Sequence, residues 1–158
     1  MTTHPNFTTD AEGHMMSNDF VLLKLERPSQ FEPVQLAVAD GSDIKAGEWA
    51  TVSGWGRTDE NATTSYELQH VKLQLKTKEE CVKALKIDDT VTCAGGPGNS
   101  PCAGDSGGPL VKSSTKGDDV LIGLVSWGDT CGRDGTPTAF AIVSRVRGWI
   151  GSIVGELA

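Results

Sequence analysis

Short segments in which apolar and polar residues alternate recur along the chain from about residue 49 onward. In one of them, Val71, Leu73 and Leu75 are separated by polar residues, and a period of two is the pattern of a strand with one buried face. Similar segments bounded by turn residues cover 49–55, 91–94, 109–112, 120–127 and 138–143. Their short lengths and close spacing predict a small antiparallel β-barrel.

Two segments have a helical pattern instead. Residues 77–80 (TKEE) have the form of a capping box, which predicts a short helix that begins at Thr77 and runs through Leu85. Near the C-terminus, apolar residues recur at helical spacing, which predicts a terminal helix that packs its apolar stripe on the barrel. The stripe comprises Val146, Trp149, Ile150, Ile153 and Val154.

The N-terminal third carries weaker signals. Residues 1–18 are polar and show no period, which predicts a loop, and the apolar run 20–25 predicts one strand that ends before Arg27 and Pro28. The following segment, with Pro33 and two glycines, predicts a connection between two packing units. We therefore expect an all-β protein in which a fragment of one unit precedes a barrel.

The composition is that of a soluble globular protein, with 37% hydrophobic and 22% charged residues. The net charge of -7 argues against nucleic acids and anionic membranes as partners, because both are bound through basic surfaces. No apolar run approaches the roughly 20 residues of a membrane span, and the first residues lack the basic and apolar regions of a signal peptide. Either the protein is cytosolic or its natural beginning lies upstream of Met1.

The cysteines leave two possibilities open. They form no Cys-x-x-Cys pair and only three histidines are present, so we expect no metal site. They are either four free buried thiols or two disulfides. Glycosylation sequons at Asn6 and Asn61 favour disulfides in a secreted glycoprotein.

The strongest chemical signal is the segment 102–110 (CAGDSGGPL), in which three glycines surround Ser106. Small residues leave a serine hydroxyl accessible, and backbone N–H groups beside glycine are easily presented to a developing oxyanion. Ser106 is therefore a candidate nucleophile. Short motifs of this kind also occur by chance, so an ordinary glycine-rich turn is the alternative.

This segment resembles the nucleophile loop of chymotrypsin/trypsin-like serine proteases, and further motifs of that family appear in the same order. Residues 18–25 (NDFVLLKL) resemble its aspartate strand, 53–58 (SGWGRT) the start of its second barrel, 126–128 (SWG) its substrate-binding strand, and the run ending at 149–150 its terminal helix. The resemblance implies the trypsin-like double-barrel fold. Residues 1–45 would be a remnant of the first barrel with the interbarrel connection. Residues 46–158 would be the second antiparallel β-barrel with a short helix and a C-terminal helix.

The resemblance implies a role for each matching residue. Ser106 is the nucleophile, Asp19 is the carboxylate that orients a catalytic imidazole, and the N–H groups of Gly104 and Ser106 form the oxyanion hole. An uncharged pocket base and a shortened pocket disfavour basic substrate side chains and select small or medium apolar ones. The substrate-binding set, from the pocket base at Ser100 to the shortening residue Thr138, is Ser100, Ser126, Trp127, Gly128 and Thr138.

The resemblance also implies the disulfides Cys81–Cys93 and Cys102–Cys131. Another disulfide of the family would join positions 50 and 112, where this chain has alanine and lysine. Because both partners of that bond are absent together, no cysteine is left unpaired, which fits a secreted protein.

Two parts of the family's machinery are missing from the printed sequence. No segment resembles the one that carries the general-base histidine, and we expect His4, His14 and His70 to be structural or solvated. The chain also begins beyond the family's activation terminus, whose amine pairs with the aspartate before the nucleophile. Asp105 occupies that position, so we expect an unpaired carboxylate, a misformed oxyanion hole and negligible peptidase activity for this chain alone.

The leading interpretation is an incomplete secreted serine endopeptidase. It would cleave protein or peptide substrates through an acyl-enzyme, need no cofactor and be a monomer when complete, with protein inhibitors as further partners. Retention of Ser106, Asp19, Gly104 and Asp105 favours this enzyme, because a protein released from catalysis has no need to keep all four. The alternative is a catalytically inactive serine protease homologue that acts as a secreted binding or inhibitor protein. A third interpretation is a barrel fragment with no role of its own.

Overall fold

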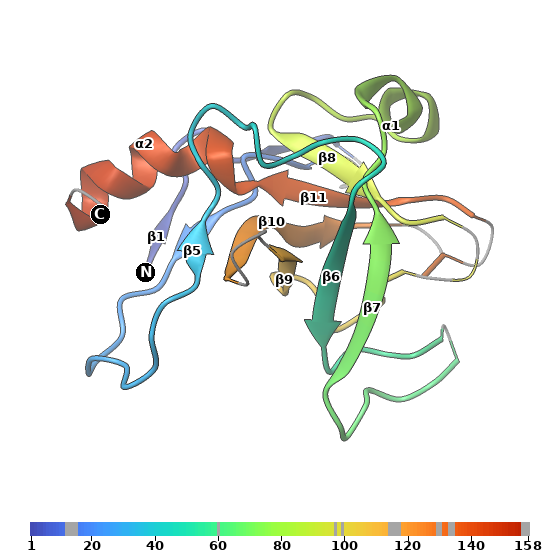
Figure 1. Ribbon diagram of the computed structural model, residues 1–158, viewed down its shortest axis with the longest axis horizontal. Helices are drawn as coiled ribbons and strands as arrows, with labels where there is room; N and C mark the ends of the chain where they lie inside the picture. Colours follow the sequence, from blue (N-terminus) through green and yellow to red (C-terminus); the bar gives the residue numbers. More distant parts are fainter. Residues whose placement is uncertain are drawn as a thin grey trace.

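The computed structural model describes residues 1–11, 16–59, 61–96, 98, 100–113, 118–128, 131–132 and 135–155. Within these residues, six antiparallel strands form the main sheet in the spatial order β7-β6-β9-β10-β11-β8 (Figure 1). They are β6 (Trp49–Gly54), β7 (Gln69–Gln74), β8 (Val91–Ala94), β9 (Pro109–Ser113), β10 (Asp119–Trp127) and β11 (Thr138–Ile142). Each strand lies where the alternating pattern predicts it, with small differences at its ends.

The two ends of this sheet meet, which closes it into a barrel. A bridge pairs Leu75, just after β7, with Ala94 at the end of β8, and the N–H of Lys76 donates to the carbonyl oxygen of Cys93 at 3.0 Å. Closure satisfies backbone groups that an open sheet would leave at its edges. The prediction of an all-β protein built on an antiparallel barrel is confirmed.

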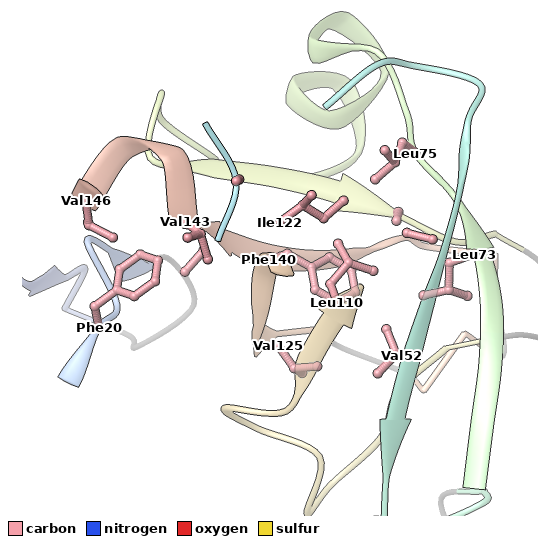
Figure 2. Packing of buried hydrophobic residues seen from close by; sticks show 14 of the residues in the cluster. Phe20, Val52, Leu73, Leu75, Leu110, Ile122, Val125, Phe140, Val143 and Val146 are labelled. Carbon is pink, nitrogen blue, oxygen red and sulfur yellow. The ribbon is translucent and has the colours of Figure 1, made fainter. Parts of the chain in front are cut away.

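Apolar side chains from all six of these strands fill the barrel. Leu73, Leu110, Ile122 and Phe140 are each at most 1% exposed and belong to one cluster (Figure 2). Burying a side chain of this size contributes about 1.5–3 kcal/mol. The cluster also includes Phe20, 7% exposed, so the N-terminal segment packs on the same core as the barrel.

The helix predicted from the capping box is confirmed. In α1 (Lys78–Ala84), the Thr77 side chain accepts from the Glu80 N–H at 3.1 Å, and the Glu80 carboxylate accepts from the Thr77 N–H at 2.8 Å. The disulfide Cys81–Cys93 then joins α1 to β8. Local capping and a covalent link together fix this helix against the barrel.

The second helix, α2 (Val143–Val154), follows β11 directly. Val143, Val146 and Ile150 are buried, but Ile153 and Val154 are 44% and 56% exposed. The predicted apolar stripe is therefore wrong in the last turn, which lies beyond the core. No helix in the described residues is long and apolar enough to cross a membrane.

The N-terminal third contains short strands that the sequence does not predict. β1 (Thr2–Thr3) pairs with β4 (Val21–Leu22), β2 (Thr8–Thr9) pairs with β3 (Met16–Ser17), and β5 (Gln35–Leu36) pairs in parallel with β10. The loop predicted over 1–18 is wrong at these strands, and within the apolar run 20–25 only β4 forms. Such short strands show no period in the sequence, because their pairing is decided by tertiary contacts. That residues 1–45 are a remnant of a first barrel stays a prediction.

The conformation of α2 can be tested at Gly148. This residue is exposed within the helix, and a Cβ added there would meet nothing within 4 Å. We expect Gly148→Ala to raise the free energy of unfolding in urea by about 1 kcal/mol, because glycine loses more backbone freedom in a helix. As a control, Gly108→Ala should lower it, since that Cβ would lie 2.7 Å from the Asp105 carbonyl oxygen. A Gly148→Ala variant no more stable than the wild type would contradict an exposed helical position.

Candidate functional site

Ser106 lies in a tight loop before β9. Gly104 and Gly107 have φ angles of +100° and +79°, which residues with a side chain rarely adopt. The Gly107 N–H donates to the carbonyl oxygen of Val125 in β10 at 2.7 Å. The glycines therefore allow the shape of the loop, and β10 holds it in place.

The Asp105 carboxylate is held by backbone amides from two segments. Its Oδ1 accepts from the Gly56 N–H at 2.8 Å, and its Oδ2 accepts from the Cys102 N–H at 3.0 Å. A Cβ at Gly54 would lie 2.0 Å from Oδ1, and one at Gly56 would lie 2.5 Å from the carboxylate, so both positions require glycine. The expectation of an unpaired carboxylate is wrong, because backbone N–H groups satisfy both of its oxygens.

The Ser106 side chain is exposed, and within the part of the chain that the structure describes its hydroxyl makes no hydrogen bond. The backbone N–H groups of Gly104 and Ser106 donate none to these residues either. Both residues are exposed. Their amides are therefore available to a carbonyl oxygen or another acceptor from outside the chain.

Asp19 lies close to this loop although it is distant in the sequence. Its Oδ2 accepts from the hydroxyl of Ser126, in β10, at 2.7 Å. Asp19 and Ser106 also line one hollow of about 470 Å³ together with Phe20. The structure thus brings together Ser106, Asp19 and Ser126, which the family resemblance places in one site.

Hydrogen bonds to the segment before β8 fix the residues next to Asp19. The Ser17 hydroxyl donates to the Asp88 carboxylate, and the Asn18 N–H donates to the Thr90 hydroxyl at 3.0 Å. Burial raises the pKa of Asp88, but hydrogen bonds from Ser17 and Thr90 outweigh burial and hold that pKa below its ordinary value. Sequence reasoning missed Asp88 and Thr90, and its one available signal was a short polar run before a predicted strand.

A second hollow, of about 340 Å³, is lined by Ser106 and by Thr138. Thr138 is 3% exposed and its Oγ1 lies 2.6 Å from the hydroxyl oxygen of Ser100. A Cβ on Gly128 would lie 3.4 Å from Thr138 Oγ1, so these two lining residues are neighbours. Ser100, predicted at the base of this pocket, does not line it but lines a different hollow. The residues that do line it include Ser106, Ser126, Trp127, Gly128 and Thr138.

The described histidines are structural or solvated. His4 is buried, its ring packs edge-on against Trp149 with 4.7 Å between ring centroids, and burial lowers the pKa of His4 below its usual 6.5. His70 is exposed on β7, opposite Ser53 of β6. His14 lies outside the described residues. Within those residues, no group of His, Cys, Asp and Glu side chains is placed to hold a metal ion.

The cysteines of the described chain are all paired. The structure contains Cys81–Cys93 and Cys102–Cys131, the two disulfides that the family resemblance implies. The second of them ties the start of the Ser106 loop to the segment that follows β10. Disulfides persist in oxidising environments, so the chain belongs to such a compartment.

The family model for Trypsin matches residues 1–150, so this chain belongs to the trypsin family.

Its curated relatives include several glucanase inhibitor proteins. Glucanase inhibitor protein 2 of Phytophthora infestans is 50% identical over 139 residues, which cover 85% of this chain and 54% of that protein. Glucanase inhibitor protein 2 of Phytophthora sojae is 45% identical over 155 residues, 96% of this chain and 53% of that protein. Glucanase inhibitor protein 3 of Phytophthora infestans is 47% identical over 154 residues, which cover 95% of this chain and 58% of that protein. The chain thus spans little more than half the length of these relatives.

These relatives overturn the leading interpretation of the chain as a serine endopeptidase. Proteins that share 45–50% identity with it over most of its length carry the name of inhibitors, not of proteases or other hydrolases. The contacts in the site explain why the motif alone led to the prediction of a protease. Asp105 holds the loop, Asp19 holds Ser126 and Gly104 permits the turn. These residues therefore have structural roles that persist without catalysis.

The anchoring role of Asp105 predicts a specific loss of stability. In Asp105→Asn an amide replaces the carboxylate, so one of its two N–H partners faces a donor instead of an acceptor. We expect the free energy of unfolding in urea to fall by about 1.5–3 kcal/mol. The matched control is Asp59→Asn, because Asp59 is exposed and, within the described residues, its carboxylate accepts from a single N–H, that of Asn61 at 2.8 Å. The control should change stability by less than about 0.5 kcal/mol, and equal losses in the two variants would exclude the anchoring role.

Burial of His4 predicts a dependence of stability on pH. Because the pKa of His4 in the folded chain lies below 6.5, the unfolded chain binds this proton more readily between the two values. Stability should therefore fall as the pH is lowered from about 7 through that window, measured as the urea midpoint at several pH values. His4→Gln should flatten this part of the profile, whereas His70→Gln, at an exposed position, should leave it unchanged. A profile that His4→Gln does not alter would rule out His4 as its source.

Proposed function

We propose that this chain is the second-barrel part of a secreted trypsin-family protein that has no peptidase activity and that binds and inhibits a glucanase. Relatives with 41–50% identity support the proposal, because they are glucanase inhibitor proteins from two species of Phytophthora. The two disulfides support secretion. Residues 1–45, which pack on the barrel core through Phe20, would be the remnant of the first barrel.

The observation in the structure that most favours binding is the exposed backbone around Ser106. Gly104 and Ser106 are exposed, and their N–H groups donate no hydrogen bond to the described residues. These N–H groups and the residues that line the hollow beside Ser106 could contact a surface loop of a partner protein. Such contacts bind a protein without any need for a nucleophile.

The test is inhibition of purified glucanases by the full chain, produced with its disulfides intact. Release of reducing sugar from a soluble glucan should fall as the concentration of the protein rises. Ser106→Ala should inhibit as well as the wild type, because binding through backbone amides does not use the hydroxyl. Loss of inhibition in Ser106→Ala would refute binding through the backbone amides, and cleavage of peptide esters that Ser106→Ala abolishes would refute the absence of peptidase activity. A failure to inhibit any glucanase in a panel that covers the different glucan linkages would refute the proposed function itself.

A further inference from the structure

The loop between β6 and β7 exposes large apolar side chains next to the Ser106 loop. Trp55 is 57% exposed, Tyr66 is 99% exposed and Leu68 is 52% exposed. Single exposed apolar residues are ordinary on protein surfaces. Three of them in one connecting loop, including a tryptophan and a tyrosine, form a group that the fold itself does not use.

This loop is held in a defined position against the Ser106 loop. The Arg57 N–H donates to the carbonyl oxygen of Ala103 at 2.9 Å, and a Cβ on Gly104 would lie 3.5 Å from the methyl group of Thr64. A β-bridge between Arg57 and Thr64 joins the two sides of the loop. The base of the loop therefore shares the rigidity of the site beside it.

Another backbone contact brings the loop's two described aromatic residues, Trp55 and Tyr66, to the same end of the loop. The Ser65 N–H donates to the carbonyl oxygen of Trp55 at 3.0 Å, so Tyr66 follows directly after the residue that is bonded to Trp55. Tryptophan and tyrosine are enriched among the residues that dominate binding energy at protein interfaces. They supply a large contact area with few rotatable bonds, so little entropy is lost when they are buried.

The charge around these residues indicates the kind of surface that they fit. The described charged residues of the loop are Arg57, Asp59 and Glu67, all exposed, so acidic side chains outnumber basic ones there. The whole chain has a net charge of -7. A partner with an apolar depression bordered by lysine or arginine side chains would match both features. A neutral glucan could stack on aromatic rings but would gain nothing from the acidic side chains.

We infer that Trp55 and Tyr66 are the anchors by which this protein docks on a basic surface of its glucanase partner. This inference rests on the proposed function and names the part of the molecule that carries it. The loop and the hollow beside Ser106 then contact the enzyme together, because the Arg57–Ala103 hydrogen bond joins them.

The test compares variants of exposed aromatic residues in different places. Trp55→Ala and Tyr66→Ala should each weaken binding to an inhibited glucanase by about 30-fold or more, as measured by calorimetry or by the inhibition constant. The matched controls are Trp49→Ala and Phe31→Ala, because these side chains are 60% and 88% exposed but lie outside the loop. Both controls should bind within about twofold of the wild type. Glu67→Gln should slow association more than it speeds dissociation, and added salt should remove that difference.

The outcomes separate this inference from the proposed function. If the wild type and Ser106→Ala inhibit a glucanase but Trp55→Ala combined with Tyr66→Ala inhibits equally well, the docking surface is wrong and the function stands. If the wild type inhibits no glucanase, both fail. Two other results would overturn the inference alone: binding of the wild type to insoluble glucan that the double variant loses, or a wild-type dimer that the double variant converts to a monomer.

Discussion

The hydrogen bonds of the Asp105 carboxylate hold together the parts of the molecule on which its site depends. One oxygen accepts from Cys102 at the start of the Ser106 loop, and the other accepts from Gly56, where the loop between β6 and β7 begins. A hydrogen bond to a charged group contributes about 1.5–3 kcal/mol, so either bond is large beside the marginal stability of a small domain. The positions of the available amides and of the Trp55 loop therefore both depend on this carboxylate.

This constraint explains why the motif of a protease nucleophile loop does not by itself establish a protease. Asp105 shapes the loop from within, and Asp19 accepts from Ser126 and so joins the N-terminal segment to β10. Unlike Asp105, the Ser106 side chain makes no hydrogen bond to the described residues. Its retention is the one feature that stability does not explain. A motif of this kind therefore establishes architecture, and function has to be argued from the surface that the architecture presents.

The features that could be predicted from the sequence are those with a local signal. The capping box at Thr77 and the alternating strands are recognised from a few neighbouring residues, and the structure contains them. The parallel pairing of β5 with β10 and the exposure of Ile153 depend on contacts with residues that are distant in the sequence. The residues next to them in the sequence give no signal of these contacts. The same limit applied at the site. Family motifs located the residues around Ser106, but the amide partners of Asp105 and the contact between the Ser100 and Thr138 hydroxyls depend on the tertiary structure.

An inhibitor of another enzyme needs a rigid surface more than a reactive one. Groups that are fixed before binding lose less entropy in the complex, so each contact yields more affinity. Here rigidity comes from the disulfide of the Ser106 loop, from the Asp105 carboxylate and from the backbone bond between Ser65 and Trp55. Because Gly56 links the carboxylate to the aromatic loop, a disturbance at Asp105 would reach the hollow and the aromatic side chains together. The two surfaces are therefore structurally coupled, and under the proposed function binding alone would require the loop geometry that a protease uses for catalysis.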